Sequence, residues 1–160
     1  MFIEKIVFKK IAVIMGSAII NPLKSGKNYS LMELLAKLEN CDWKDFEQII
    51  SEVFETHNYK SFWNVNLTIN GKRRQFDVVS VKNAKHLLIE CKKWGNKKSR
   101  LSALRNAAVK HKEKCGFYKE FVNQDVLPVI IIYNDECVKE LENVYVVPLN
   151  KLNDFILGLP

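Results

Sequence analysis

The sequence predicts an α/β fold of the α+β type, built on one mixed sheet, with its elements in the order αβββαβ from residue 41 onward. Three observations favour this fold. Residues 42–57 carry the apolar spacing of an amphipathic helix, residues 58–93 contain three strand patterns separated by turn signals, and residues 126–133 form a nearly continuous apolar run. Such a run is typical of a strand covered on both faces.

Length and composition bound the domain organisation. A chain of 160 residues with 48% hydrophobic residues can bury one core, so we interpret residues 41–160 as a single domain and residues 1–40 as an N-terminal extension packed on it. The extension contains IAVIMGSAII at residues 11–20, after two lysines, which resembles a signal peptide. Its uninterrupted apolar core is shorter than the roughly 7–15 residues of a signal peptide, so we favour a strand or short helix.

The first two helices have clear start signals. Ser30 and Glu33 form a capping box that opens a short helix. Asp42 is the expected N-cap of the longer helix that follows. The apolar stripe of this second helix consists of Phe46, Ile49, Ile50, Val53 and Phe54. Glu47 borders that stripe, so its carboxylate lies either in solvent or at the edge of a buried site.

Three strands follow this helix. We expect them at residues 58–70, 75–81 and 87–93, with one turn at Asn70-Gly71 and a second at residues 82–85. Stacking on nucleic-acid bases is one role for the aromatic residues of the first strand. We interpret them as core residues instead, because aromatic side chains in strands usually pack in the core.

The second turn places two acids opposite each other. If it is centred between Asn83 and Ala84, Asp77 faces Glu90 across the antiparallel pair, where Cβ atoms lie roughly 4.5–5.5 Å apart. Side chains two residues apart share a face of a strand, so Lys92 lies on the same side as Glu90, and Cys91 points to the other side. The hairpin therefore gathers Asp77, Glu90 and Lys92 at one end.

This combination of side chains suits metal-assisted phosphate chemistry. Two carboxylates at such a distance repel each other unless a cation lies between them. A hard ion such as Mg²⁺ takes oxygen ligands, keeps several waters and bridges to substrate phosphate, and the lysine can orient a water or offset phosphoryl charge. A solvated surface hairpin is the alternative. However, both acids stand inside apolar runs, where an uncompensated charge is costly.

The segment after the second acid is strongly basic. Its charges lie in a loop and in a helix that is capped by Ser99 or Ser102 and is expected to run to about Lys114. A solvated helix face is one interpretation. Beside a site for phosphodiester chemistry, these charges would instead contact phosphates, which supply most non-specific affinity for nucleic acid. The candidate DNA-contacting residues are Lys93, Lys97, Lys98, Arg100 and Arg105.

The C-terminal part completes the sheet. The strand over residues 126–133 contains Pro128, which lacks an N–H and should lie near the strand start or at an unpaired edge. A further strand is expected at residues 143–147 and a terminal amphipathic helix at residues 150–157.

Several other chemistries find no support in the sequence. There is no G-x-G-x-x-G, G-x-x-x-x-G-K-[ST] or H-E-x-x-H motif. The four cysteines form no C-x-x-C pair, so we expect no zinc ribbon, no disulfide framework, and a reducing, cytoplasmic location. The histidines are scattered, and His86, beside the second turn, is interpreted as exposed. No apolar run reaches the ~18 residues of a membrane span, and the net charge of +7 favours a polyanionic partner.

The two acids and the lysine resemble the motif of the PD-(D/E)XK nuclease superfamily, whose fold is called restriction-endonuclease-like. The motif stands here as Phe76-Asp77, twelve intervening residues and Glu90-Cys91-Lys92, with Phe in place of the usual Pro. Together with the αβββαβ order, the resemblance extends over about three-quarters of the chain. It is greatest to archaeal Holliday-junction resolvases and to the catalytic domains of Mrr-type restriction endonucleases.

The resemblance implies a metal-dependent DNA endonuclease, either resolvase-like or of a restriction and defence type. Asp77, Glu90 and the Cys91 carbonyl would bind Mg²⁺ (or Mn²⁺), and Glu47, on the first helix of the core, would assist directly or through a water. Lys92 would position the attacking water or stabilise the phosphoryl charge. The expected partners are double-stranded or branched DNA and, since related nucleases often dimerise, a second copy of the chain. No membrane is expected.

Two alternatives stay open. A DNA-binding module that keeps the fold but does not cut would show salt-sensitive DNA binding without metal binding. RNA cleavage of the tRNA-splicing type uses His, Tyr and Lys without metal, and the two carboxylates argue against it.

Overall fold

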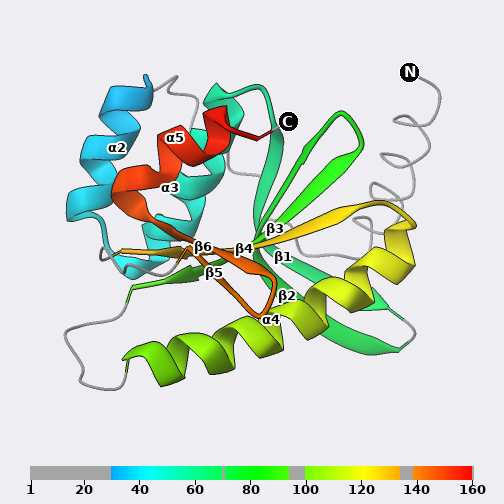
Figure 1. Ribbon diagram of the computed structural model, residues 1–160. Helices are drawn as coiled ribbons and strands as arrows, with labels where there is room; N and C mark the ends of the chain where they lie inside the picture. The colour runs from blue at the N-terminus through cyan, green and yellow to red at the C-terminus, as the bar shows by residue number, and fades with distance from the viewer. Residues whose placement is uncertain (1–29, 70, 94–99, 134–138, 160) are drawn as a thin grey trace.

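A computed structural model describes residues 30–69, 71–93, 100–133 and 139–159 of the chain. Its centre is a six-stranded sheet in the order β1-β2-β3-β4-β6-β5 (Figure 1). β1, β2 and β3 are antiparallel neighbours, whereas β4 runs parallel to both β3 and β6. The described elements are α2 (Leu31–Asn40), α3 (Trp43–Thr56), β1 (Lys60–Ile69), β2 (Lys72–Lys82), β3 (Lys85–Lys92), α4 (Arg100–Val122), β4 (Val126–Ile132), β5 (Glu140–Leu141), β6 (Val144–Pro148), the 3₁₀ turn η1 (Leu149–Lys151) and α5 (Leu152–Leu157). The predicted mixed sheet and its αβββαβ order are confirmed.

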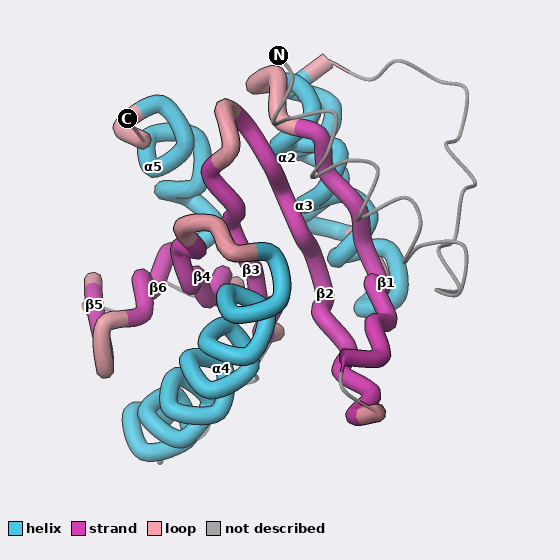
Figure 2. The backbone as a smooth tube through the Cα atoms, turned by 90° about the vertical axis from the view of Figure 1, so that its right-hand side faces the viewer, coloured by secondary structure: helices cyan, strands magenta, loops and turns pink. Residues whose placement is uncertain are grey.

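Helices cover both faces of the sheet. α2, α3 and α5 lie over one face, and α4 crosses the other (Figure 1, Figure 2). A cluster with Phe46, Phe54 and Ile89 fills the space under α3, while clusters that include Leu88 and Ile130 lie under α4. The central strands β3 and β4 are therefore covered on both sides, in keeping with the apolar sequence of β4 and of residues 87–89 in β3.

The β2–β3 hairpin has the register that the sequence predicts. Its two-residue turn consists of Asn83 and Ala84, whose φ angles of 50° and 61° match the turns that join twisted antiparallel strands. The ladder runs from Lys82, paired with Lys85, to Val78, paired with Ile89. One position further on, the same register sets Asp77 opposite Glu90.

α4 is longer than predicted. It continues to Val122, about two turns beyond the expected end at Lys114. The extra turns are stabilised by burial, because Cys115 and Tyr118 are 4% and 1% exposed and pack on the part of the sheet formed by β1, β2 and β3. The interruption of the apolar pattern near Lys114 marks a polar contact of the helix with the sheet and not the end of the helix.

His86 is buried, which contradicts the prediction of an exposed side chain. It is 0% exposed, and its Nδ1 lies 2.9 Å from the Tyr118 hydroxyl, in the last turns of α4. Burial lowers the pKa of His86 to about 4, so the imidazole is neutral at neutral pH. The prediction was wrong because it ended α4 too early and left nothing to cover the hairpin end of β3.

Smaller differences concern the ends of elements. Ser102 lies inside α4 and is not its cap. Asp42 precedes α3 as predicted, but its side chain makes no capping hydrogen bond. Pro128 lies near the start of β4, before the segment that pairs with β6, in agreement with the prediction. The two-residue strand β5 was not predicted because it is too short to carry a pattern.

The N-terminal extension is described only in its last part. The capping box of Ser30 and Glu33 is present, and α2 packs on α3 through Leu34 and Leu38. The strand or helix expected at residues 11–20 lies outside the described residues, so the proposed boundary near residue 40 stays a prediction. Among the helices described, none is long and apolar enough to span a membrane.

Candidate functional site

Asp77 lies where β2 and β3 stop pairing. Its Oδ2 accepts a hydrogen bond of 2.8 Å from the backbone N–H of Cys91, so a carboxylate replaces the backbone partner that a continued ladder would supply. The N–H and C=O of one strand residue point to the same edge of the strand. The Cys91 carbonyl therefore also faces β2, beside Asp77.

The charge of Asp77 is disfavoured in this position. Burial and, after it, the negative charge of Glu90 raise the pKa of its carboxyl group to about 6. The hydrogen bond from Cys91 and the charges of Lys114 and Lys92 offset only part of it. Asp77 is thus an acid whose ionised form lacks sufficient compensation within the protein.

The surroundings of Glu90 favour its charged form. Its Oε1 lies 2.7 Å from Lys92 Nζ, and its Oε2 lies 2.6 Å from Lys114 Nζ on α4. Burial alone would raise the pKa of Glu90, but the hydrogen bonds and charges of Lys114 and Lys92 outweigh it and lower the pKa to about 2. His111 Nδ1 lies 3.6 Å from Oε2, so three side chains surround this carboxylate.

α3 contributes a third acid from the other layer of the structure. Burial, with a further effect of the negative charges of Asp77 and Glu90, raises the pKa of Glu47 to about 7. Lys92 acts in the opposite direction. Since these electrostatic effects require proximity, Glu47 belongs to the same group of charges as Asp77, Glu90 and Lys92.

The structure therefore brings four of the sequence-predicted site residues, Glu47, Asp77, Glu90 and Lys92, into one group, with the fifth, Cys91, contributing its backbone. The Cys91 side chain points to the other face, into the core under α3, as predicted. No set of three or more His, Cys, Asp or Glu side chains is already arranged to hold a metal ion in the described part of the chain. The catalytic and metal-binding roles of these residues stay predictions.

Sequence reasoning missed two neighbours of Glu90. Lys114 was counted only as one of several basic residues on α4, and His111 was regarded as isolated. His111 is 1% exposed; its Nε2 lies 2.8 Å from the Leu88 carbonyl, and its Nδ1 faces Glu90. A signal was present, because His111 continues the spacing of the buried residues of α4, which are Leu104, Ala108, Cys115 and Tyr118.

The candidate DNA-contacting residues differ in their surroundings. Lys93 donates to the Cys41 carbonyl at 2.8 Å and lies over the Tyr133 ring, so its ammonium group is occupied within the protein. Arg105 is exposed on α4, 3.8 Å from Glu142. Lys97 and Lys98 and the side chain of Arg100 lie outside the described residues.

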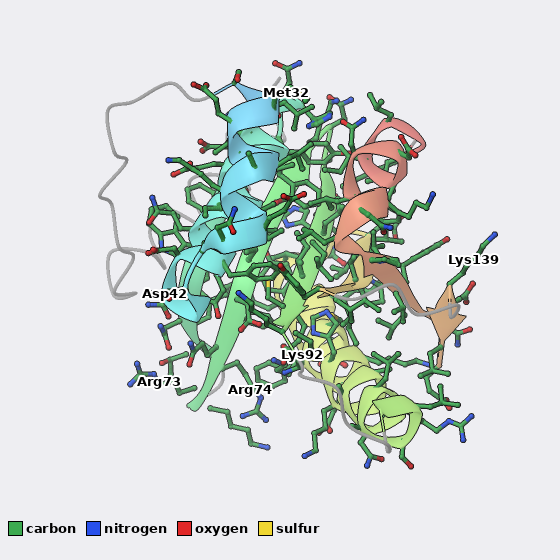
Figure 3. The ribbon with its side chains drawn as sticks, turned by 90° about the vertical axis from the view of Figure 1, so that its left-hand side faces the viewer. Met32, Asp42, Arg73, Arg74, Lys92 and Lys139 are labelled. Atoms are coloured by element: carbon green, nitrogen blue, oxygen red, sulfur yellow. The ribbon has the colours of Figure 1, made fainter. Side chains whose placement is uncertain are left out.

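A cavity of about 700 Å³ opens beside Glu90 and Lys92, between β2 and α4. Besides these two residues, it is lined by Arg74, Ala103, Asn106, Ala107, Lys110, Glu113, Lys114 and Phe117. Arg73 and Arg74 project from the same end of β2, and Lys92 lies near α4 (Figure 3). Cations outnumber acids in this lining, so the cavity suits a negatively charged ligand that reaches the carboxylates from the α4 side.

Residues 38–120 match the restriction endonuclease family Mrr_cat, a segment that makes up more than half of the chain. The chain belongs to this restriction endonuclease family. The resemblance to the PD-(D/E)XK superfamily is thereby confirmed, and the family membership identifies a nuclease-like domain. The match includes α3, the three antiparallel strands and most of α4, which are the elements that carry the acids and lysines described above.

Three known proteins are similar to this member of the restriction endonuclease family. An uncharacterized protein of Archaeoglobus fulgidus is 24% identical over 117 residues, covering 73% of this chain and 91% of the relative. The crystal structure of the small subunit of the heterodimeric restriction endonuclease R.BspD6I shares the fold, with a TM-score of 0.53, 18% identity, and coverage of 81% of this chain and 76% of that chain. The crystal structure of the protein of unknown function AF1548 has a TM-score of 0.44 and is 14% identical. The match covers 70% of this chain and 53% of that chain.

Proposed function

We propose that this protein is a metal-dependent endonuclease that hydrolyses phosphodiester bonds in double-stranded or branched DNA. The supporting observation is the placement of two partly buried carboxylates, Asp77 and Glu90, beside Lys92 at the point where β2 and β3 separate. A solvated ion pair would not raise the pKa of Asp77 to about 6. An acid such as Asp77, held in an environment that opposes its charge, is typical of a functional site.

The available donors fit a hard divalent cation, Mg²⁺ or Mn²⁺. Asp77, Glu90 and the Cys91 carbonyl would hold it, with Glu47 in direct contact or linked through a water. All of these donors are oxygens, which such ions prefer. The ion would compensate the negative charges of Asp77 and Glu47, whose pKa values are raised by burial and by repulsion from neighbouring acids. When bound, it would supply stabilisation of phosphoryl charge and a more acidic water.

The two lysines have separate roles in this proposal. Both hold the Glu90 carboxylate, and a cation would have to displace at least one of them. Lys92 shares the strand face of Glu90, so its freed ammonium group can hold the attacking water or a phosphoryl oxygen. Lys114 reaches the site from α4 and lines the cavity, where it can hold a phosphate of the bound strand.

Cleavage assays on a Glu90→Gln variant test the proposal directly. Wild-type protein should cut branched, nicked or linear DNA in the presence of Mg²⁺ or Mn²⁺, and Glu90→Gln should reduce the rate by roughly 10²-fold or more, because a neutral amide is a poor ligand for a hard cation. Glu120→Gln is the matched control, since Glu120 is exposed on α4. Cutting at similar rates by the wild type and by Glu90→Gln would remove the basis of the proposal.

A second candidate function is a DNA-binding module that does not cut. The supporting observation is that Lys92 and Lys114 form ion pairs with Glu90. These pairs compensate the charge of the carboxylate without a metal ion. Titration calorimetry separates the two functions, because an endonuclease of this kind must bind Mg²⁺ or Mn²⁺ and the binding module need not. Heat of binding that disappears in Asp77→Asn favours the endonuclease.

Two further features belong to the proposal. Cleavage of both strands would be achieved by a homodimer, which sedimentation in the presence of DNA would detect. A reducing, cytoplasmic location suits the thiols of Cys41, Cys91 and Cys115, which are free cysteines in the structure.

A further inference from the structure

The cavity between β2 and α4 has the dimensions of a small-molecule site. Its volume of about 700 Å³ falls within the roughly 300–1,000 Å³ that such sites occupy. A nucleotide fits in this space, whereas a base-paired duplex can only lie across its mouth. Because Glu90 and Lys92 line the cavity, whatever enters it comes directly beside the candidate catalytic group.

One wall of the cavity offers a flat surface to a base. The Arg74 guanidinium group lies over the Phe117 ring, with Cζ 5.2 Å from the ring centroid. Both side chains line the cavity and both are half-buried. Unpaired bases stack on aromatic rings and on guanidinium planes, and such stacking is tolerant of sequence because every base has a π-face.

The polar lining separates into groups for phosphate and groups for a base. Lys110 and Lys114 carry the positive charge that a phosphate requires. Glu113 and Asn106 line the same cavity on α4, and a carboxylate there would repel a phosphate. Carboxylate and amide groups instead match the N–H groups of a base edge, such as the amino groups of cytosine and adenine. If the cavity bound phosphate alone, Glu113 would have no role in binding.

We propose that this cavity binds one unpaired nucleotide of a DNA strand, with its base on the Arg74–Phe117 pair and its phosphate on Lys110 and Lys114. The preferred substrate is then DNA that has single-stranded character next to the cleaved bond, such as a tailed or branched duplex. The proposal rests on the proposed endonuclease function for its biological meaning, but the binding itself needs neither metal nor cleavage.

Binding measurements in EDTA test this inference separately from catalysis. Fluorescence anisotropy would compare a blunt duplex with the same duplex carrying an unpaired tail. Wild-type protein should bind the tailed duplex about tenfold more tightly, and Phe117→Leu should remove most of this preference because it removes the stacking surface. Phe121→Leu is the matched control: Phe121 is half-buried on the same helix and packs on the same cluster, but it does not line the cavity.

A base analogue provides a direct readout of stacking. With 2-aminopurine in the unpaired tail, binding of wild-type protein should quench its fluorescence, and Phe117→Leu and Arg74→Gln should each weaken this quenching. Glu113→Ala removes a negative charge, so a purely electrostatic groove would bind all DNA more tightly. The proposed nucleotide site instead loses affinity for the tailed duplex.

Three outcomes would overturn the inference. These are equal affinity for tailed and blunt DNA, equal effects of Phe117→Leu and Phe121→Leu, and tighter binding of an RNA tail than of the DNA tail with the same sequence. Thermal melting of each variant identifies loss of folding, in which case Arg74→Gln, at a half-exposed position, decides the question. A tail preference without metal-dependent cutting would refute the endonuclease proposal and leave the nucleotide site intact.

Discussion

Asp77 is expected to lower the stability of the protein in the absence of metal. The pKa of this acid is raised from 3.8 to about 6, so the folded state binds its proton more strongly than the unfolded state does. The protonated Asp77 side chain therefore stabilises the folded state when the pH lies below 3.8, the pKa of the unfolded state. This contribution to the free energy of unfolding is lost as the pH rises through about 6. Asp77→Asn keeps an acceptor for the Cys91 N–H and removes the charge. We therefore expect Asp77→Asn to be more stable than the wild type by about 1–3 kcal/mol near pH 8, without metal.

Urea unfolding at a series of pH values checks this expectation. The difference between the two proteins should shrink as the pH falls and disappear below about pH 3, where Asp77 is protonated in both states because the ordinary pKa of its carboxyl group is 3.8. His86 and His111, whose pKa values are lowered to about 4, titrate in the same way in both proteins and cancel in the comparison. Asp125→Asn, at an exposed position, is the control. A variant Asp77→Asn that is less stable than the wild type near pH 8 would show that the charge of Asp77 is compensated.

The acids and the lysine on the two strands could be predicted at the residue scale, and the partners on α4 could not. Alternation along β3 and the centre of the turn together fix which side chains of the hairpin meet. Lys114 and His111 come from a helix whose rotation about its own axis has to be read from an apolar stripe. The spacing of that stripe is regular, but it includes a histidine at position 111 and an alanine at position 108, so its apolar pattern is easily overlooked.

At the scale of elements, the Asn83-Ala84 turn sets the register that brings Asp77 opposite Glu90. Ala84 has a φ angle of 61°, where a Cβ atom costs roughly 1–2 kcal/mol. Glycine has no such cost, but it adds roughly 0.4–1 kcal/mol of chain entropy to the unfolded state. Ala84→Gly should therefore stabilise the protein by about 0.5–1 kcal/mol and leave DNA cleavage unchanged.

Thermal unfolding of Ala84→Gly beside Ala36→Gly checks this prediction. Ala36 is exposed within α2, where glycine should destabilise the protein by about 0.5–1 kcal/mol. Opposite shifts in melting temperature are expected for the two substitutions. Destabilisation by both would mean that the turn conformation does not strain Ala84.

The limits of sequence reasoning at this scale lie at the ends of elements. The three antiparallel strands were predicted because each is bounded by turn residues and has its own pattern. The end of α4 was misplaced because Tyr118, which continues its buried stripe, follows a run of polar and small residues. This one misplaced end also explains the misassignment of His86, which lies against Tyr118. Local pattern does not reveal which distant segment covers a residue.

At the scale of the whole molecule, the two faces of the sheet have different roles. α2, α3 and α5 cover one face, and α4 covers the other (Figure 2). The cavity lies beside α4. The net charge of +7 alone does not say where a polyanion binds. The structure concentrates cations at the cavity, where Arg74, Lys110 and Lys114 lie next to Glu90. DNA is therefore expected to approach from the α4 side of the sheet.

The salt dependence of DNA binding should show whether DNA binds on the α4 side of the sheet. Each phosphate neutralised by the protein contributes about 0.9 to the slope of log K against log salt concentration. Lys110→Gln and Arg105→Gln, at exposed positions on α4, should each weaken binding of a blunt duplex and reduce the slope by about 1. Lys151→Gln, at an exposed position in η1 on the other side of the sheet, removes the same charge and should leave the slope unchanged. Equal slopes for all three variants would mean that DNA affinity depends only on the net charge of the protein. The α4 surface would then have no special role in binding.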